Sequence, residues 1–138
     1  MGMKPLIKQL LRENIDSLIE RRKNYPSQIR DFVVFAKKYF GIKGKIKIII
    51  TSDKSKTSTL AHYEIGGNIV IYGKDRSLCD LERSIGHELF HVKQFEDGLL
   101  NNPAEQGKDG SEIENMANAK AGELIRVWGK MNPIIYEY

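Results

Sequence analysis

Apolar residues recur at helical spacing over the first forty positions of the chain. Between residues 4 and 22 they fall three or four positions apart, which predicts an amphipathic helix. The segment Tyr25-Pro26-Ser27 interrupts this pattern, and Pro26 or Ser27 is expected to open a second helix that Gly41 ends. The apolar face of this second helix comprises Ile29, Phe32, Val33, Phe35, Ala36 and Phe40. Both helices are expected to serve as scaffold.

The pattern changes to that of β-strands at Gly44. Residues 45–51 begin in strict alternation and are rich in isoleucine, which predicts a strand. After a polar loop, two apolar segments at 60–65 and 68–72 flank Gly66-Gly67, a strong signal for a β-hairpin. Three strands in succession predict a small, twisted and mostly antiparallel sheet.

Helical spacing returns in the last part of the chain. Asp75 is expected to cap a long helix that Gly98 ends, because apolar residues repeat three and four positions apart between them. A polar loop then leads to a final helix that begins near Ser111, where Glu114 completes a capping-box pattern. Gly129 is expected to end this helix. The element order ααβββαα predicts an α+β fold.

The length of the chain is that of one domain. A chain of 138 residues can bury a modest core without disulfides or metals as staples. We therefore expect a single domain spanning residues 1–138. It divides into a helical N-terminal part (1–42), a core that carries the chemistry (44–128) and a C-terminal tail (129–138).

Charge and composition argue against two classes of partner. The net charge of +4 is spread over separate groups of lysine and arginine, without a compact basic stripe, so no nucleic acid is expected. No apolar run approaches the about 18 residues of a membrane span, and charged residues interrupt the N-terminal apolar positions where a secretory signal would lie. The single cysteine, Cys79, excludes a disulfide framework and a Cys-rich metal site. These features predict a cytoplasmic protein with no membrane partner.

The helix that Gly98 ends carries an HExxH motif, His87-Glu88-Leu89-Phe90-His91. Residues four apart on a helix share one face, so His87 and His91 can bind one metal ion together. Glu88 is rotated by about 100° from His87, which places it beside the position of a bound water. The motif therefore predicts a Zn²⁺ site in which Glu88 is the catalytic base.

Two histidines leave a catalytic zinc site one protein ligand short. No His or Cys follows His91, but a glutamate on the final helix would complete a His₂Glu set, and both Glu112 and Glu114 fit by distance. A histidine ligand needs an oxygen acceptor for its other N–H, and Asn118 lies one turn beyond Glu114. Glu114 is thus the expected third ligand, with Asn118 orienting one of the histidines. The alternative for Asn118 is an ordinary exposed helix position.

The HExxH motif followed by Glu114-Asn115-Met116-Ala117-Asn118 resembles the gluzincin metallopeptidases, and most of all their minimal single-domain members, the minigluzincins. The E-x-x-A-N pattern also occurs in the phage-immunity metallopeptidases that act on repressor proteins. The resemblance implies a zincin-like fold, with a small twisted sheet, then the active-site helix, then the glutamate helix. It also implies that strand 68–72 forms the upper rim of the cleft and pairs with an extended substrate.

The expected activity is zinc-dependent hydrolysis of bonds in a peptide or protein substrate. Larger gluzincins stabilise the tetrahedral intermediate with a His or Tyr donor beyond the glutamate helix. In this chain the candidates are Tyr136 and Tyr138 in the tail and His62 and Tyr63 on the first hairpin strand. The sequence does not choose among them, so the donor stays unassigned.

Two alternatives to a constitutive peptidase stay open. The enzyme can be latent, inhibited by oligomerisation or by the apolar tail 134–138 lying in the cleft, although this tail can equally be an ordinary packed terminus. The chain can also be a non-catalytic metal-binding module or a regulatory, partner-binding module. Closed metal coordination would favour such a module, and an open position would favour the enzyme.

Overall fold

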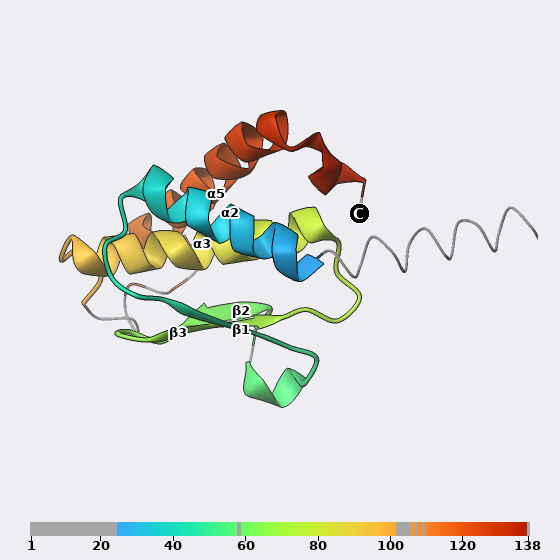
Figure 1. Cartoon of the computed structure of the whole chain (residues 1–138). Coiled ribbons are helices and arrows are strands. Elements are labelled where there is room, and N and C mark those ends of the chain that lie inside the picture. Colours follow the sequence, from blue (N-terminus) through green and yellow to red (C-terminus); the bar gives the residue numbers. More distant parts are fainter. Residues whose placement is uncertain (1–24, 58, 102–105, 107, 109, 138) are drawn as a thin grey trace, which may run out of the picture.

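One long helix lies on a three-stranded sheet, and two further helices pack against it (Figure 1). The computed structural model describes residues 25–57, 59–101, 106, 108 and 110–137. The helix expected at residues 4–22 lies outside these described residues. Within them the structure is α+β, as the sequence predicts. No helix in the described ranges has both the length and the apolar character needed to span a bilayer.

The sheet is mixed rather than mostly antiparallel. Its strands are β1 (Lys47–Thr51), β2 (Ala61–Tyr63) and β3 (Asn68–Tyr72), in the order β1-β3-β2. β2 and β3 form the expected antiparallel hairpin, but β1 runs parallel to β3 over its whole length. The mostly antiparallel expectation is therefore wrong for the longer of the two pairings.

The burial of β3 explains this strand order. The side chains of Ile69, Val70 and Ile71 are all buried, whereas every residue of β1 and β2 is exposed or half-buried. A strand with consecutive buried apolar residues needs cover on both faces and both edges, so it takes the central position. Gly66, with φ of +81°, supplies the left-handed turn residue that joins β2 to β3.

In the described ranges, the other layer consists of the helices α2 (Tyr25–Phe40), α3 (Leu78–Glu96) and α5 (Glu112–Met131). The N-cap of α3 is Ser77 rather than the expected Asp75, which lies in the preceding turn with φ of +57°. The hydroxyl of Ser111 caps α5 as predicted, accepting a hydrogen bond from the Glu114 backbone N–H. Helix α5 continues two residues beyond Gly129, the expected end.

A glycine allows the helices to approach closely behind the HExxH motif. A Cβ atom placed on Gly86 would lie 3.1 Å from Leu124 Cδ2 of α5 and 3.6 Å from Phe32 Cζ of α2. Phe32 and Leu124 are fully buried at this crossing, and the Phe32 ring meets Trp128 edge to face. The small residue before His87 thus lets α5 lie close to α3, where Glu114 can reach the histidines.

The tail packs against the far end of α5. Residues 133–136 form a short 3₁₀ helix, η2 (Pro133–Tyr136), in which Ile135 is fully buried and Tyr136 lies beside Gly129. Fifteen residues of α5 separate Gly129 from Glu114, a rise of about 22 Å. The described part of the tail is therefore a packed terminus remote from Glu114, not an occupant of the cleft.

Glu82 is a buried acid whose ionisation is expected to make stability depend on pH. It is fully buried, and burial raises its pKa to about 8 although the nearby Trp128 side chain has a smaller opposite effect. The ordinary pKa is 4.5, so between about pH 4.5 and 8 the native state holds a proton that the unfolded state has lost. Stability therefore falls as pH rises through this window, by at most about 1.4 kcal/mol per pH unit.

Replacing Glu82 with glutamine is expected to remove this dependence. Glu82→Gln keeps the shape but cannot ionise, so its melting temperature should exceed that of the wild type by several degrees at pH 8 and by much less at pH 5. Thermal unfolding at the two pH values measures this difference, with Glu112→Gln as an exposed control. If the melting temperatures of Glu82→Gln and the wild type differed by the same amount at both pH values, the expectation would be contradicted.

Candidate metal centre

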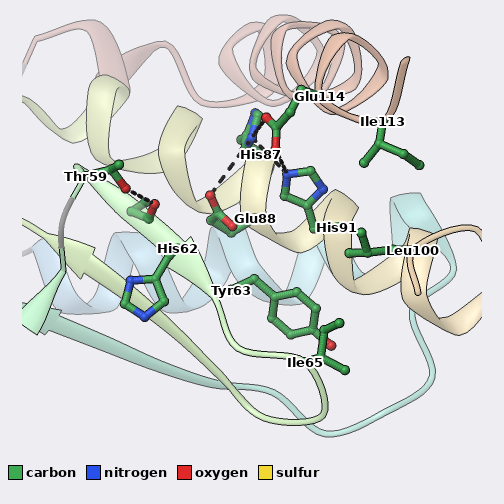
Figure 2. A pocket seen from close by; sticks show the side chains of 11 residues that line it. Thr59, His62, Tyr63, Ile65, His87, Glu88, His91, Leu100, Ile113 and Glu114 are labelled. Atoms are coloured by element: carbon green, nitrogen blue, oxygen red, sulfur yellow. Dashed lines mark hydrogen bonds and ion pairs between the residues drawn. The ribbon is translucent and has the colours of Figure 1, made fainter. Parts of the chain in front are cut away.

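Helix α3 brings the two motif histidines together as the spacing predicts. The Nε2 atoms of His87 and His91 lie 3.1 Å apart, and Figure 2 shows both rings on the same side of the helix. His91 is buried and His87 is half-buried. Two imidazole nitrogens directed at one point form half of a metal site.

The carboxylate of Glu114, on α5, faces both histidine rings. Its Oε2 lies 2.9 Å from His87 Nε2 and its Oε1 lies 2.9 Å from His91 Nε2 (Figure 2). Glu112 is exposed and lines neither hollow beside the histidines. Of the two glutamates weighed from the sequence, the structure brings Glu114 to the histidines. Because its carboxylate is used there, Glu114 contributes only its backbone N–H to the Ser111 cap.

A buried glutamine fixes the orientation of His91. The His91 Nδ1 atom lies 2.7 Å from Gln94 Oε1, and Gln94 Nε2 donates to the carbonyl oxygen of Ile113 at 3.1 Å. Since the amide nitrogen is used by Ile113, the oxygen faces His91 and must accept the Nδ1–H proton. The Nε2 lone pair of neutral His91 is therefore free to bind a cation. Sequence reasoning missed Gln94.

Asn118 is the corresponding candidate at His87. Its side chain lines the same hollow as His87 and lies close enough to affect the pKa of that ring, although Asn118 itself is exposed. The pKa of His87 is lowered, first by burial and then by the neighbouring His91, which favours the neutral ring that a metal requires. Asn118 thus lies near His87, and its orienting function stays a prediction.

The residues present fit a small divalent cation. Two imidazole lone pairs and a carboxylate converge within 3.1 Å of one another in a largely buried site. Electron-rich atoms at such distances repel unless a cation or a proton lies between them. A tetrahedral zinc ion with bonds of about 2.0–2.1 Å separates its ligand atoms by about 3.3 Å. The ligand atoms would therefore need to move apart by only a few tenths of an ångström to admit the ion.

Glu88 lies beside this centre rather than in it. One ligand atom each from His87, Glu88 and His91 fall within 4.8 Å of one another, so Glu88 is itself a possible ligand. However, Glu88 Oε1 is 4.0 Å from His87 Nε2, whereas the Glu114 oxygens are at 2.9 Å. Glu114 is thus the closer of the two carboxylates to the histidines. Burial, with a smaller contribution from the Glu114 charge, raises the pKa of Glu88 to about 8.

The structure directs one expected oxyanion donor away from the centre. His62 Nδ1 lies 2.8 Å from Thr57 Oγ1 and its Nε2 lies 3.2 Å from Glu64 Oε1, and its ring points away from the other histidines (Figure 2). Successive side chains of a strand point to opposite faces of the sheet. Because Ala61 and Tyr63 pack against the core, the His62 side chain lies on the other face.

The tyrosine candidates are no better placed. Tyr63 lines the pocket, but its hydroxyl accepts a hydrogen bond from the Gly66 N–H in the hairpin turn. Tyr136 is at the far end of α5, and Tyr138 lies outside the described residues. Within the described ranges, none of the expected candidates has a donor group aimed at the centre.

The centre opens into a pocket between the sheet and the two helices. This cavity has a volume of about 360 Å³, and Figure 2 shows that its wall opposite the helices comes from β2 and the turn that follows it. Its lining residues are Thr59, Ala61, His62, Tyr63, Ile65, His87, Glu88, His91, Leu100, Ile113 and Glu114. A second hollow of about 510 Å³ shares His87 and Glu88 with the first, so the two form one cleft across the centre.

The rim of this cleft is β2, not strand 68–72 as expected from the resemblance. β3 has a partner on each side, β1 and β2, and therefore has no free edge for another chain. Among the described residues, β2 pairs only with β3 and leaves its other edge open. The expectation failed because the buried β3 takes the middle of the sheet.

Comparisons with known proteins do not identify a family for this chain. Searches against protein-family models, curated protein sequences and solved structures find no significant match. What the centre can do is therefore inferred from its residues. They are two imidazoles whose Nε2 atoms lie together, a carboxylate that faces both and a second buried carboxylate beside them.

Gln94 provides a direct test of how the histidine ligands are oriented. Gln94→Leu removes the acceptor for His91 Nδ1–H, and zinc affinity is expected to fall by about 10- to 100-fold. Gln94→Glu also loses the bond to the Ile113 carbonyl but keeps an acceptor for His91, so it should retain most of the affinity. Competition with a fluorescent chelator measures the zinc affinity of each variant. Equal affinities in the two variants would contradict this role of Gln94.

Proposed function

We propose that this chain is a zinc-dependent peptidase with a zincin-like fold, related to the gluzincins. His87, His91 and Glu114 would hold the metal, and Glu88 would act as the general base. The observation that carries the proposal is the convergence of the two Nε2 atoms with both Glu114 oxygens, beside the buried Glu88 carboxylate. Helical spacing alone cannot produce this arrangement, because Glu114 comes from another helix.

The chemistry divides among the residues of the centre. When bound, Zn²⁺ supplies Lewis acidity, which polarises a carbonyl group and lowers the pKa of a coordinated water towards about 7. Glu88, whose Oε1 lies 4.0 Å from His87 Nε2, would take the proton of an attacking water and pass it to the leaving amine. Gln94 keeps the His91 imidazole in the orientation that directs its lone pair inward, and Asn118 would do the same for His87.

The open edge of β2 supports an extended peptide as the substrate. Leu60 O and Glu64 N bond to β3, so the backbone groups of the alternate residues Ala61 and Tyr63 point to the opposite edge. The Ala61 carbonyl accepts a hydrogen bond there from the Thr59 hydroxyl at 2.7 Å. A peptide added to this edge would place its backbone across the cleft, next to Glu88 and the histidines.

One observation favours a second candidate, a non-catalytic metal-binding module. None of the expected side-chain donors in the described residues is aimed at the place where an oxyanion would develop. Loss of one such donor typically costs about 100- to 1000-fold in turnover. A centre without one can still hold a metal for structural or regulatory purposes.

Cleavage of a peptide library separates the two candidates. The zinc-loaded full chain would be incubated with mixed synthetic peptides, and mass spectrometry would identify new termini. The peptidase proposal predicts new termini that disappear when a chelator removes the zinc and return when zinc is restored. Stoichiometric zinc without any cleavage would favour the non-catalytic module.

A further inference from the structure

The second hollow extends the cleft on one side of the catalytic residues. It is bounded by Thr59 and Ala61 from the β2 side, by Arg83 and Ser84 from α3 and by Asn118 from α5. It shares His87 and Glu88 with the pocket in Figure 2, so anything bound in it would continue from the same centre.

Arg83 is the fixed positive charge of this hollow. The other described residues that line it are neutral apart from Glu88 and the titratable His87. The Arg83 side chain is exposed, and no hydrogen bond or ion pair holds it within the described part of the chain. An unpaired guanidinium at the wall of a cleft is a ready binding group for a planar carboxylate.

The nearby Arg76 is different. Its guanidinium bonds to the Asp80 carboxylate at 2.7 Å and to the Tyr72 carbonyl at 2.8 Å, and it also bonds to the Ser84 hydroxyl. These contacts join α3 to the end of β3, so Arg76 has a structural role. Arg83 has no comparable role, which leaves its charge available to a ligand.

The spacing along α3 places Arg83 at a defined distance from the chemistry. It lies four residues before His87 on the same helical face, a rise of about 6 Å. An extended peptide advances about 3.3 Å per residue, so this rise corresponds to about two residues of substrate.

The direction of β2 tells which end of the substrate lies there. The chain enters β2 from Leu60, which lines only the second hollow, and runs towards Tyr63 and Ile65, which line only the first. A peptide paired antiparallel to β2 would run the opposite way, in the arrangement with the more stable hydrogen bonds. Its C-terminal part would then occupy the hollow that contains Arg83.

We propose that Arg83 binds a carboxylate of the substrate about two residues on the C-terminal side of the cleaved bond. This inference rests on the proposed peptidase function. The carboxylate has two possible sources, an Asp or Glu side chain within a longer peptide or the free C-terminus of a peptide cut near its end. Either source makes the preferred substrate acidic on this side.

Matched peptides test the proposal. The zinc-loaded full chain would be given peptides that carry Glu or Gln two residues beyond the bond identified in the library, each with a free or amidated C-terminus. We expect one carboxylate, either the side chain or the free terminus, to raise kcat/KM by about tenfold or more over its neutral counterpart. A difference between the Glu and Gln peptides identifies the side chain as the source of the carboxylate, and a difference between the free and amidated peptides identifies the C-terminus.

Variants assign the preference to Arg83. Arg83→Ala should abolish it, and Arg83→Glu should reverse it in favour of a Lys at the same substrate position, while both keep their zinc. Arg126→Ala, which removes an exposed arginine of α5 that lines neither hollow, should keep the wild-type preference.

Two results would overturn the proposal while leaving the peptidase function intact. One is equal cleavage of acidic and neutral peptides by the wild type. The other is an acidic preference that survives in Arg83→Ala or that applies on the N-terminal side of the bond. Failure of the zinc-loaded wild type to cleave any library peptide would instead reject the proposed function, and the Arg83 subsite with it.

Discussion

Replacing Glu88 with glutamine is expected to abolish peptide hydrolysis without loss of zinc. The amide keeps the size and burial of the side chain but cannot accept a proton from water. General-base catalysis contributes about 10²- to 10⁴-fold, so kcat should fall by that factor. Glu88 Oε1 is 4.0 Å from His87 Nε2, farther than either Glu114 oxygen from its histidine, so the ligand set should be unaffected. Cleavage rates and zinc content of the same preparations measure the two effects.

A glutamate outside the cleft provides the matched control. Glu123 is on α5 and forms an ion pair with Lys120, so Glu123→Gln should keep both wild-type activity and zinc. If Glu88→Gln retained more than about a tenth of the wild-type rate, Glu88 would not be the general base. If it lost zinc together with activity, Glu88 would instead be a ligand.

Replacing Glu114 with alanine is expected to remove the metal. One oxygen of the carboxylate lies 2.9 Å from each histidine Nε2 atom. Loss of a partner that merely orients a ligand costs about 10- to 100-fold in metal affinity, and loss of the ligand itself should cost more. Competition titration against a chelator of known affinity would therefore show a decrease of more than about 100-fold.

Glu112→Ala is the control for this prediction. Glu112 lies two residues earlier on the same helix, carries the same charge and is exposed. It also lies in the first turn of α5, so both substitutions remove a carboxylate that favours the positive end of the helix. Equal loss of zinc in the two variants would show that helix stability, rather than ligation, explains the effect.

The sequence predicts much of this centre because its geometry is local. His87, Glu88 and His91 are placed by the period of a single helix, and the Ser111 cap fixes where the next helix begins. The preference for Glu114 over Glu112 followed from the need of a histidine ligand for an acceptor, and Asn118 does lie beside His87.

Gln94 was missed although the sequence contains a signal for it. It lies three residues after His91 and near the end of α3, where it is 1% exposed. A glutamine on the apolar face of a helix beside a metal motif needs partners for both ends of its amide. Here they are the His91 ring and the Ile113 carbonyl, and the second of these depends on how α5 packs.

The order and direction of the strands were not available from local patterns. Segments 45–51 and 68–72 have similar apolar content, and nothing in either indicates whether they pair in parallel. That choice depends on burying Ile69, Val70 and Ile71 together, which is a property of the whole sheet. The cleft edge was assigned to the wrong strand for the same reason, and so the subsite at Arg83 could not be foreseen.

Elemental analysis of the wild-type protein tests the central claim most directly. The full chain would be stripped of metal, incubated with zinc and freed of excess ion by gel filtration before analysis. The convergence of His87, His91 and Glu114 predicts about one zinc ion per chain. A protein that is folded by circular dichroism but carries no zinc after this treatment would contradict the metal centre and the peptidase function proposed from it.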